Sequence, residues 1–518
     1  MLARCATAAL LGFDAQAVTV EVDIAPGLPG LQLVGLADAA VQEARERVRA
    51  ALRNSGLRVP LTRVVVSLAP ADLPKAGPGF DLPIALGLLI ASGQLAPAQL
   101  QGVWSAGELG LDGRLRPVRG ALALALAARR QGARALVVPA GNRAEAALVQ
   151  GLAVWGAGHL QEVLALLADP PAPGLGTASG AAPAERTEAP DLADVQGQAH
   201  GRRALEIAAA GGHHLLLVGP PGSGKTMLAR RLPGLLPPLG NEEALEVTQV
   251  HSVAGLLAEG AGLVRQRPFR SPHHSCSAPA LIGGGALPRP GELSLAHRGV
   301  LFLDELAEFR REVLDQLRQP LEDGEVWLSR ARRRCRFPAR VLLVAATNPC
   351  PCGFHGDPQA EPGGGGQPCR CGEGQRRRYW GRLSGPLLDR LDLQVTMERP
   401  TAQELAQAIA RPAAGLESTH AVGRRVRRAR RRMERRNPGG CCNAELAAAA
   451  LPGVMALQPG ALALWERALT SRRLTARGGE KVLRLARTIA DLAGEDAVAP
   501  TAVGEALLYR SYDLRPMP

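Results

Sequence analysis

The residues best suited to chemistry form the run Gly219-Pro220-Pro221-Gly222-Ser223-Gly224-Lys225-Thr226. Glycines let the backbone N–H groups of such a loop close around phosphates, while a compact lysine ammonium reaches the β and γ oxygens and a threonine hydroxyl binds Mg²⁺. Lysine is almost absent elsewhere, because the 61 Lys and Arg residues include only Lys75, Lys225 and Lys481 as lysines. The sequence therefore predicts a nucleotide site for ATP and Mg²⁺.

Two apolar runs end in polar residues that would complete such a site. Residues 300–303 lead into Asp304 and Glu305, and a second strand-like run leads into Asn348. In a parallel α/β sheet these strand ends meet beside the phosphate loop. We expect Asp304 to hold Mg²⁺ with Thr226, Glu305 to activate the attacking water, and Asn348 to sense the γ-phosphate or that water. Taken alone, the acidic pair equally suits a buried strand that enters a helix cap.

Four cysteines form two Cys-x-Cys pairs, Cys350 with Cys352 and Cys369 with Cys371, separated by 16 residues. The intervening segment is rich in Gly and Pro and has too few apolar residues for a core, so it would gain from a clamp. Four thiolates suit tetrahedral Zn²⁺ in a closed, structural site. We expect zinc there; reduced free thiols and redox pairing are the alternatives.

Arginine is concentrated in two segments. In residues 325–337, two strand-like arms flank a tip, and the side chains suited to phosphate contact are Arg330, Arg332, Arg333 and Arg334. A solvated charged turn is the alternative. The denser block at 424–436 is typical of a solvated helix face, and direct contact with DNA is its second interpretation.

Composition limits the class of protein. The 518-residue chain is too long for one hydrophobic core, and its net charge of +13 favours an anionic partner, nucleic acid before membrane. No apolar run reaches the roughly 20 residues of a membrane helix. The first residues lack a convincing cleavage site, so we expect no signal peptide. Nine cysteines, an odd number, argue against a disulfide framework and favour a cytoplasmic location.

Composition also divides the chain into segments. Residues 169–190 are rich in Pro, Ala and Gly without apolar periodicity, which predicts a linker. Before it, residues 1–168 alternate strand-like and helix-like runs, which predicts an α/β domain. After it, residues 191–400 predict the nucleotide domain with a parallel sheet, and residues 401–518 predict a helical lid.

Four long stretches then show a resemblance to a known family: GELSLAHRGVLFLDELAEF, LRQPLEDGEVWLSRA, FPARVLLVAATNPCPCG and RLSGPLLDRLDL. They resemble the ComM/YifB family, bacterial AAA+ proteins related to the ATPase subunit of magnesium chelatase and, more distantly, to ring helicases. The resemblance covers nearly the whole chain. It implies an N-terminal Lon-protease-like (ribosomal S5-like) α/β domain, an AAA+ P-loop α/β domain and a C-terminal helical lid.

The resemblance also implies roles for two arginines. Related proteins form hexamers with ATP at subunit interfaces, so Arg390 is expected to act as an arginine finger toward the neighbouring subunit. A surface ion pair with Asp389 or Asp392 is the alternative. Arg477 matches the position of the second sensor in the lid. In related ring motors, the hairpin at 325–337 points into the pore and follows a nucleic-acid backbone.

The N-terminal segments PKAGPGFD and GELGLDGRL resemble the Lon-protease fold, in which a serine nucleophile follows a Gly-Pro pair and a lysine acts as its base. Here Gly79 occupies the serine position, and the lysine position falls near Leu122. Nucleophile and base are therefore both missing. The resemblance implies a structural or ring-assembly role for this domain, with DNA contact as the second possibility, and Lys75 is expected to be a surface or local-packing residue.

The function implied by the resemblance is that of an ATP-driven homo-hexameric DNA motor. Such a helicase promotes branch migration while single-stranded DNA is integrated during natural transformation, with single-stranded and branched DNA and other recombination proteins as partners. A chelatase-type ATPase that remodels a metal-insertion complex is the alternative. An ATP-dependent protease is disfavoured by Gly79 and Leu122.

Overall fold

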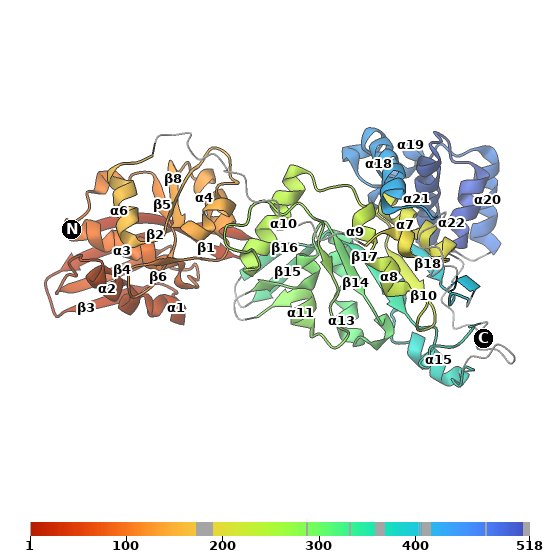
Figure 1. The fold of residues 1–518 in the computed structure, drawn as a ribbon, viewed down its shortest axis with the longest axis horizontal. Helices are drawn as coiled ribbons and strands as arrows, with labels where there is room; N and C mark the ends of the chain where they lie inside the picture. The colour runs from red at the N-terminus through yellow and green to blue at the C-terminus, as the bar shows by residue number, and fades with distance from the viewer. Residues whose placement is uncertain are drawn as a thin grey trace.

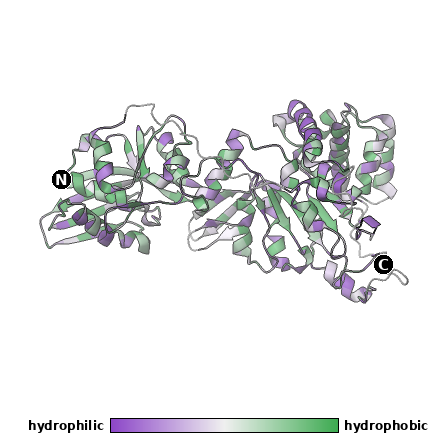
Figure 2. Ribbon diagram, viewed as in Figure 1, coloured by the Kyte–Doolittle hydropathy of each residue, from purple (hydrophilic) through white to green (hydrophobic). Residues whose placement is uncertain are grey.

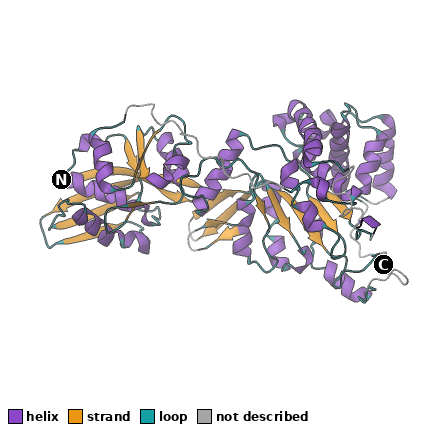
Figure 3. Cartoon of the chain, viewed as in Figure 1, coloured by secondary structure: helices purple, strands orange, loops and turns teal. Residues whose placement is uncertain are grey.

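The computed structural model describes residues 2–171, 190–285, 288–330, 333–357, 368–401, 403, 404, 406, 416–471 and 474–510. The chain forms an N-terminal α/β part, a central α/β part, and a helical part that lies at the far end of the central one (Figure 1). Figure 3 shows strands in the first two parts and a predominance of helices in the third. The predicted fold class is confirmed. Most of the predicted linker at 169–190 lies outside the described residues.

The N-terminal part is built on one mixed sheet in the order β3-β4-β2-β1-β5-β8-β9. The strands are β1 (Leu2–Leu11), β2 (Asp14–Ala25), β3 (Gly30–Val34), β4 (Arg63–Ala69), β5 (Val103–Ser105), β8 (Ala135–Pro139) and β9 (Ala153–Ala157). Strands β1 and β2 form an antiparallel hairpin, whereas β5, β8 and β9 run parallel. The strand-like runs at 18–24, 63–68, 103–106 and 135–139 predict strands, which are present as β2, β4, β5 and β8. The strands β1, β3 and β9 were not predicted; in β1, the small Ala, Cys and Thr side chains give a weak strand signal.

Helices cover both faces of this sheet, and the main ones are α2 (Ala44–Asn54), α3 (Asp81–Ala91), α4 (Ala121–Arg130) and α6 (Leu160–Ala168). Both α3 and α4 contact β1 and β2. Successive residues of a strand point to opposite faces. Accordingly, Cys5 of β1 lies in the buried apolar cluster that includes α3, whereas Ala8 lies in the cluster on the other face, which includes α4.

The central part contains a parallel sheet in the order β11-β14-β17-β10-β18. The strands are β10 (Leu215–Val218), β11 (Phe269–Arg270), β14 (Val300–Leu303), β17 (Leu342–Thr347) and β18 (Leu393–Thr396). The strand-like runs at 214–218, 300–303 and 340–345 predict strands, which are present as β10, β14 and β17. The two edge strands were not predicted; β11 has only two residues, too few to show a period. The sheet is flanked by helices that include α7 (Ala199–Gly211), α10 (Asn241–Ala254) and α14 (Arg318–Asp323).

The two α/β parts share one apolar core. Helix α4 of the first part packs on α10 of the second, and a continuous cluster of buried residues includes Leu122, Val250 and Val253. The turn between β1 and β2 also reaches across: the N–H of Phe13 donates to the carbonyl oxygen of Arg336 at 3.2 Å, and Gln249 donates to the carbonyl oxygen of Phe13 at 2.8 Å. The N-terminal part is therefore packed onto the central one through a shared apolar core and hydrogen bonds.

The helical part consists mainly of α18 (Thr419–Arg436), α20 (Pro459–Ser471), α21 (Ala476–Ala493) and α22 (Pro500–Leu508). Helix α18 is largely hydrophilic, in contrast to the apolar strands of both sheets (Figure 2). It contains the predicted arginine block. Arg425 pairs with Glu206 at 2.5 Å, and Arg436 pairs with Asp491 at 2.5 Å. Several of these arginines thus hold the lid together and to the central part.

The exposed arginines of α18 fall on one stripe at helical spacing: Arg424, Arg428, Arg431 and Arg435. This is the arrangement expected of a solvated helix face. Among the helices of the described residues, none has both the length and the apolar character that crossing a membrane requires.

Candidate functional site

The phosphate loop, residues 219–226, connects β10 to helix α8 (Lys225–Ala229). Gly222 and Gly224 have φ of +80° and +85°, in the left-handed region that favours glycine. The Lys225 Nζ donates to the carbonyl oxygens of Gly219 at 2.6 Å and Pro220 at 2.8 Å. Burial lowers the pKa of Lys225 to about 8, although the nearby Asp304 carboxylate opposes that shift. The ammonium thus lies folded into the loop that would receive the phosphates.

The ends of β14 and β17 bring the predicted partners to this loop. The Thr226 Oγ1 donates to Oδ2 of Asp304 at 2.7 Å, and the Lys225 Nζ lies 3.3 Å from Oδ1 of Asn348. A hydroxyl and a carboxylate are the hard oxygen ligands that Mg²⁺ takes. Their juxtaposition therefore fits the predicted magnesium site, and the ammonium beside them fits a triphosphate.

Glu305 has a conformation that is rare outside glycine. Its φ is +52°, and its N–H donates to Oδ1 of Asp304 at 2.9 Å. Such backbone strain costs of order 1–3 kcal/mol and is concentrated at functional sites. The Glu305 side chain is 54% exposed, so its carboxylate is accessible to a water molecule.

A histidine contacts this carboxylate. The Nδ1 of His274 lies 2.7 Å from Oε2 of Glu305, and the His274 ring packs on His273 at 4.1 Å between centroids. A few positions before these histidines, residues 269 and 270 form the edge strand β11. The contact between His274 and Glu305 was not predicted.

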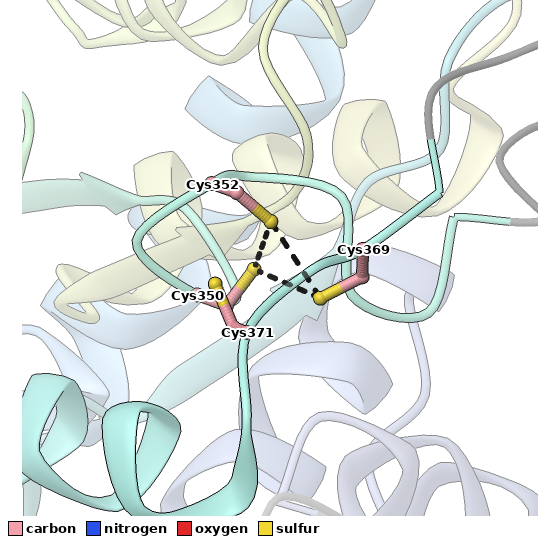
Figure 4. A group of neighbouring side chains, drawn as sticks. All are labelled: Cys350, Cys352, Cys369 and Cys371. Atoms are coloured by element: carbon pink, nitrogen blue, oxygen red, sulfur yellow. Dashed lines mark hydrogen bonds between the residues drawn. The ribbon is translucent and has the colours of Figure 1, made fainter.

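The four cysteines predicted to bind zinc do come together, and we call them the cysteine cluster (Figure 4). Their Sγ atoms all lie within 4.8 Å of one another, with separations of 3.3 Å for Cys350–Cys352, 3.5 Å for Cys352–Cys369 and 3.7 Å for Cys350–Cys369. A Zn–S bond of about 2.3 Å places tetrahedral sulfurs about 3.8 Å apart. The donor set therefore fits a tetrahedral thiolate metal.

One thiol of the cluster is already biased toward the thiolate. Burial opposes ionisation of Cys352, but N–H groups of Phe354 and Arg370 and the neighbouring thiols outweigh it and lower the pKa of Cys352 to about 6. All nine cysteines are free in the structure.

Arg390 and Arg477 converge on a single carboxylate rather than on the phosphate loop of their own chain. Arg390 pairs with Oε2 of Glu322 at 2.5 Å, and Arg477 lies 3.4 Å from Oε1 of the same residue. The alternative partners of Arg390, Asp389 and Asp392, are not its ion-pair partners among the described contacts. Glu322 was not predicted, and it places both arginines on one face of the subunit.

The arginine hairpin has the predicted form, with β15 (Glu325–Arg330) paired antiparallel to β16 (Arg333–Pro338). Arg332 lies outside the described residues, as do the side chains of Arg330 and Arg333; Arg334 is exposed. Trp327, which the sequence interpretation missed as a site residue, is 52% exposed and stands opposite Arg336. An exposed tryptophan within an arginine-rich strand pair was the signal that could have revealed it.

The N-terminal part places no nucleophile and base at the predicted positions. Gly79 lies beside Val118, and Leu122 is fully buried in the core that continues into the central part. Lys75 is also fully buried, where its ammonium donates to the carbonyl oxygen of Pro70, so it is a packing residue and not a surface one.

Comparison with known proteins agrees with this geometry. The family model described as Magnesium chelatase, subunit ChlI, matches residues 191–405, that described as Subunit ChlI of Mg-chelatase matches residues 20–142, and that described as Magnesium chelatase, subunit ChlI C-terminal, matches residues 416–510.

Similar full-length proteins are also known. The chain is 46% identical over 517 residues to an uncharacterized protein of Mycobacterium tuberculosis, covering 99% of each chain. It is 46% identical over 508 residues to the uncharacterized protein YifB of Escherichia coli, covering 98% of this chain and 96% of the other. It is 43% identical over 507 residues to the competence protein ComM of Haemophilus influenzae, covering 97% and 96%. The chain therefore belongs to the ComM/YifB family of magnesium-chelatase-like AAA+ proteins.

Proposed function

We propose that this chain hydrolyses ATP in a homo-hexameric ring and uses the energy to move DNA, as a helicase that promotes branch migration during recombination in natural transformation. The observation that carries the proposal is the convergence of Lys225, Asp304 and Asn348 at the ends of three adjacent strands, in the same domain as an arginine hairpin. The name of the competence protein ComM, a relative along nearly the whole chain, supports the DNA role.

The roles of the chain's own residues follow from their positions. Lys225 neutralises charge on the phosphates, Glu305 accepts a proton from the attacking water, and Asn348 orients that water or the γ-phosphate. Thr226 and Asp304 would hold Mg²⁺, which supplies a charge that polarises the phosphoryl oxygens. Arg390 acts as the arginine finger toward the ATP of the adjacent subunit and Arg477 as the second sensor of the lid, and each would leave Glu322 to contact a phosphate.

Two features suit the hairpin to a DNA strand. Arginines at its tip contact phosphates, and the exposed indole of Trp327 provides a surface on which a base can stack, a contact worth about 1–3 kcal/mol. The cysteine cluster binds structural Zn²⁺ in this proposal, since four thiolates form a closed tetrahedral site.

The test is ATP hydrolysis with and without single-stranded DNA, beside branch migration on a synthetic junction. Wild type is expected to show DNA-stimulated hydrolysis and junction movement, and Lys225→Ala to show neither. Trp327→Ala is expected to weaken DNA binding while basal hydrolysis is kept. The exposed Leu462→Ala, outside both arginine segments, is a control on another surface. Hydrolysis that ignores DNA, together with no DNA binding, would contradict the motor proposal.

A second candidate is an ATPase that remodels a metal-insertion complex. It is favoured by the names of the matching family models, which refer to the magnesium chelatase subunit ChlI. Such an ATPase would be stimulated by partner subunits and not by DNA, so the same assay separates the two.

A further inference from the structure

The cysteine cluster lies directly against the ATPase residues. Strand β17 ends at Thr347, Asn348 follows, and Cys350 is two residues further along the same segment. The side chain that faces Lys225 and the buried first thiol of the cluster are thus connected by a single proline, Pro349. Any displacement of Cys350 is passed to Asn348 through a short and stiff piece of backbone.

The loop between Cys350 and Asp357 also packs on the phosphate loop. At Gly353, whose φ is +88°, a Cβ atom would lie 2.6 Å from Cδ of Pro221, so only glycine permits this approach. Contact this close fixes the position of one loop relative to the other.

The side chain of Arg399 contacts both the phosphate loop and residues 350–357, which we call the cysteine loop. Its Nε donates to the carbonyl oxygen of Pro221 at 3.1 Å, and its guanidinium lies 4.9 Å from the ring centroid of Phe354. It also forms an ion pair at 3.4 Å with Asp357, whose side chain is 1% exposed. One cation therefore contacts the phosphate loop and both an aromatic and an acidic residue of the cysteine loop.

The second cysteine pair is tied to the end of β17 through helix α15 (Glu373–Trp380), which begins two residues after Cys371. The Trp380 Nε1 donates to the carbonyl oxygen of Pro349 at 2.9 Å, and the Tyr379 hydroxyl lies 3.3 Å from Oγ1 of Thr347. Both halves of the cluster therefore contact the segment that presents Asn348.

We propose that the metal held by the cysteine cluster positions Asn348 and Pro221 for ATP, so that removal of Zn²⁺ weakens nucleotide binding. The cysteine loop contains little apolar material of its own, and without the metal it would be held by contacts such as those of Gly353, Arg399 and α15. This inference rests on the proposed function for the ATPase site and for zinc. It assigns the metal a positioning role at the nucleotide, beyond stabilising a loop.

The first test compares zinc-loaded and zinc-free full-length protein. Purified protein is expected to carry about one zinc per chain, and dialysis against a strong chelator under reducing conditions is expected to raise the Kd for a fluorescent ATP analogue roughly tenfold or more, the size typical of outer contacts of a metal site. Adding Zn²⁺ back is expected to restore the affinity. Circular dichroism checks that the chain stays folded.

The second test leaves the thiolates intact. Arg399→Ala is expected to keep its zinc and yet bind the ATP analogue more weakly, because Pro221 loses its link to the cysteine loop. Cys369→Ser is expected to lose both zinc and affinity, and the control Cys441→Ser neither. If chelation unfolds the chain, Arg399→Ala decides the matter.

Protein purified without zinc, or zinc-free and Arg399→Ala proteins that bind the analogue with wild-type affinity, would overturn the proposal. Failure of the proposed function is distinguishable. Nucleotide affinity that depends on zinc, in a protein whose hydrolysis is indifferent to DNA, would leave this inference standing and contradict the motor.

Discussion

Each of the two α/β parts buries a lysine, but among the described contacts only Lys225 lies beside polar side chains from the ends of neighbouring strands. Lys75 and Lys225 both donate to main-chain carbonyl oxygens inside the protein. Around Lys225, the ends of neighbouring strands supply Asp304 and Asn348. The N-terminal part supplies only Gly79 and a buried leucine at the corresponding reactive positions. Burial of an ammonium is therefore not in itself a sign of a functional site. The convergence of polar groups at the ends of neighbouring strands is the better indicator.

The largest expected effect separates the two lysines. Lys225→Ala is expected to lower kcat/KM for ATP by about 10³-fold, because the transferring phosphoryl group loses a fixed positive charge. Lys75→Met keeps the buried volume and is expected to leave hydrolysis nearly unchanged while lowering Tm. Steady-state hydrolysis and thermal unfolding of both variants check this. An equal loss of hydrolysis in folded Lys75→Met protein would remove the distinction.

A smaller effect is expected at His274. Its contact with Glu305 fixes the direction of the carboxylate, so His274→Ala is expected to lower kcat roughly tenfold with little change in nucleotide Kd. His274→Gln keeps a hydrogen-bond donor and is expected to recover most of the rate. Single-turnover hydrolysis and equilibrium binding separate the two parameters. If both variants behave alike, the contact does not position Glu305.

The pH dependence of ATP binding tests the surroundings of Lys225. Burial lowers the pKa of Lys225 in the folded, nucleotide-free protein to about 8, so the ammonium loses its proton around pH 8. Above that pH, the lysine must take up a proton to bind phosphates as a cation. The Kd for ATP is therefore expected to rise by about tenfold per pH unit above 8. Calorimetry in two buffers should detect the proton uptake. The same depression means that burying the charged lysine costs stability below pH 8, and this cost is relieved as pH rises.

In Lys225→Arg the charge persists throughout this range, so the pH dependence should flatten. A wild-type Kd that stays constant from pH 7.5 to about pH 9.5 would show that the ammonium is not the titrating group.

The smallest effect on hydrolysis is expected from changes at Gly79 and Leu122, the positions that correspond to the nucleophile and base of the Lon-protease fold. Gly79→Ser is expected to fold normally, because a Cβ there would meet Val118 at an ordinary 3.7 Å. Leu122→Lys places a charge in the shared core and is expected to lower stability by about 3 kcal/mol or more. Urea unfolding measures both. The double variant, Gly79→Ser with Leu122→Lys, is expected to have no proteolytic activity on an unfolded protein substrate. Activity in this assay would show that the rest of a protease site is still present in the N-terminal part.

The parts of the candidate site that could be predicted consist of residues that lie close together in the sequence. The phosphate loop, the pair Asp304 and Glu305, and Asn348 each follow an apolar strand, and parallel strands must present their ends together. The cysteine pairs were predictable for the same reason, since their spacing is local. The order of the strands in the sheet could not be predicted, because short strands such as β11 show little periodicity.

Contacts between distant segments were not predictable. His274 reaches Glu305, and Arg399 reaches Pro221, through tertiary packing that leaves no local pattern. The convergence of Arg390 and Arg477 on Glu322 likewise depends on how the lid sits on the central part. A single sequence shows which residue types occur and with what periodicity. It does not show how far apart two helices or strands lie once they have packed against each other.

The apolar contact between α4 and α10 bears on what the N-terminal part does for the central one. A chain shortened to its central and helical parts would uncover Val250 and Val253, along with the edge of β16 that the Phe13 turn now covers. Unpaired strand edges beside apolar patches invite aggregation. Selection for solubility alone would then preserve the N-terminal part independently of any reaction it performs, and would resist changes at the buried Leu122.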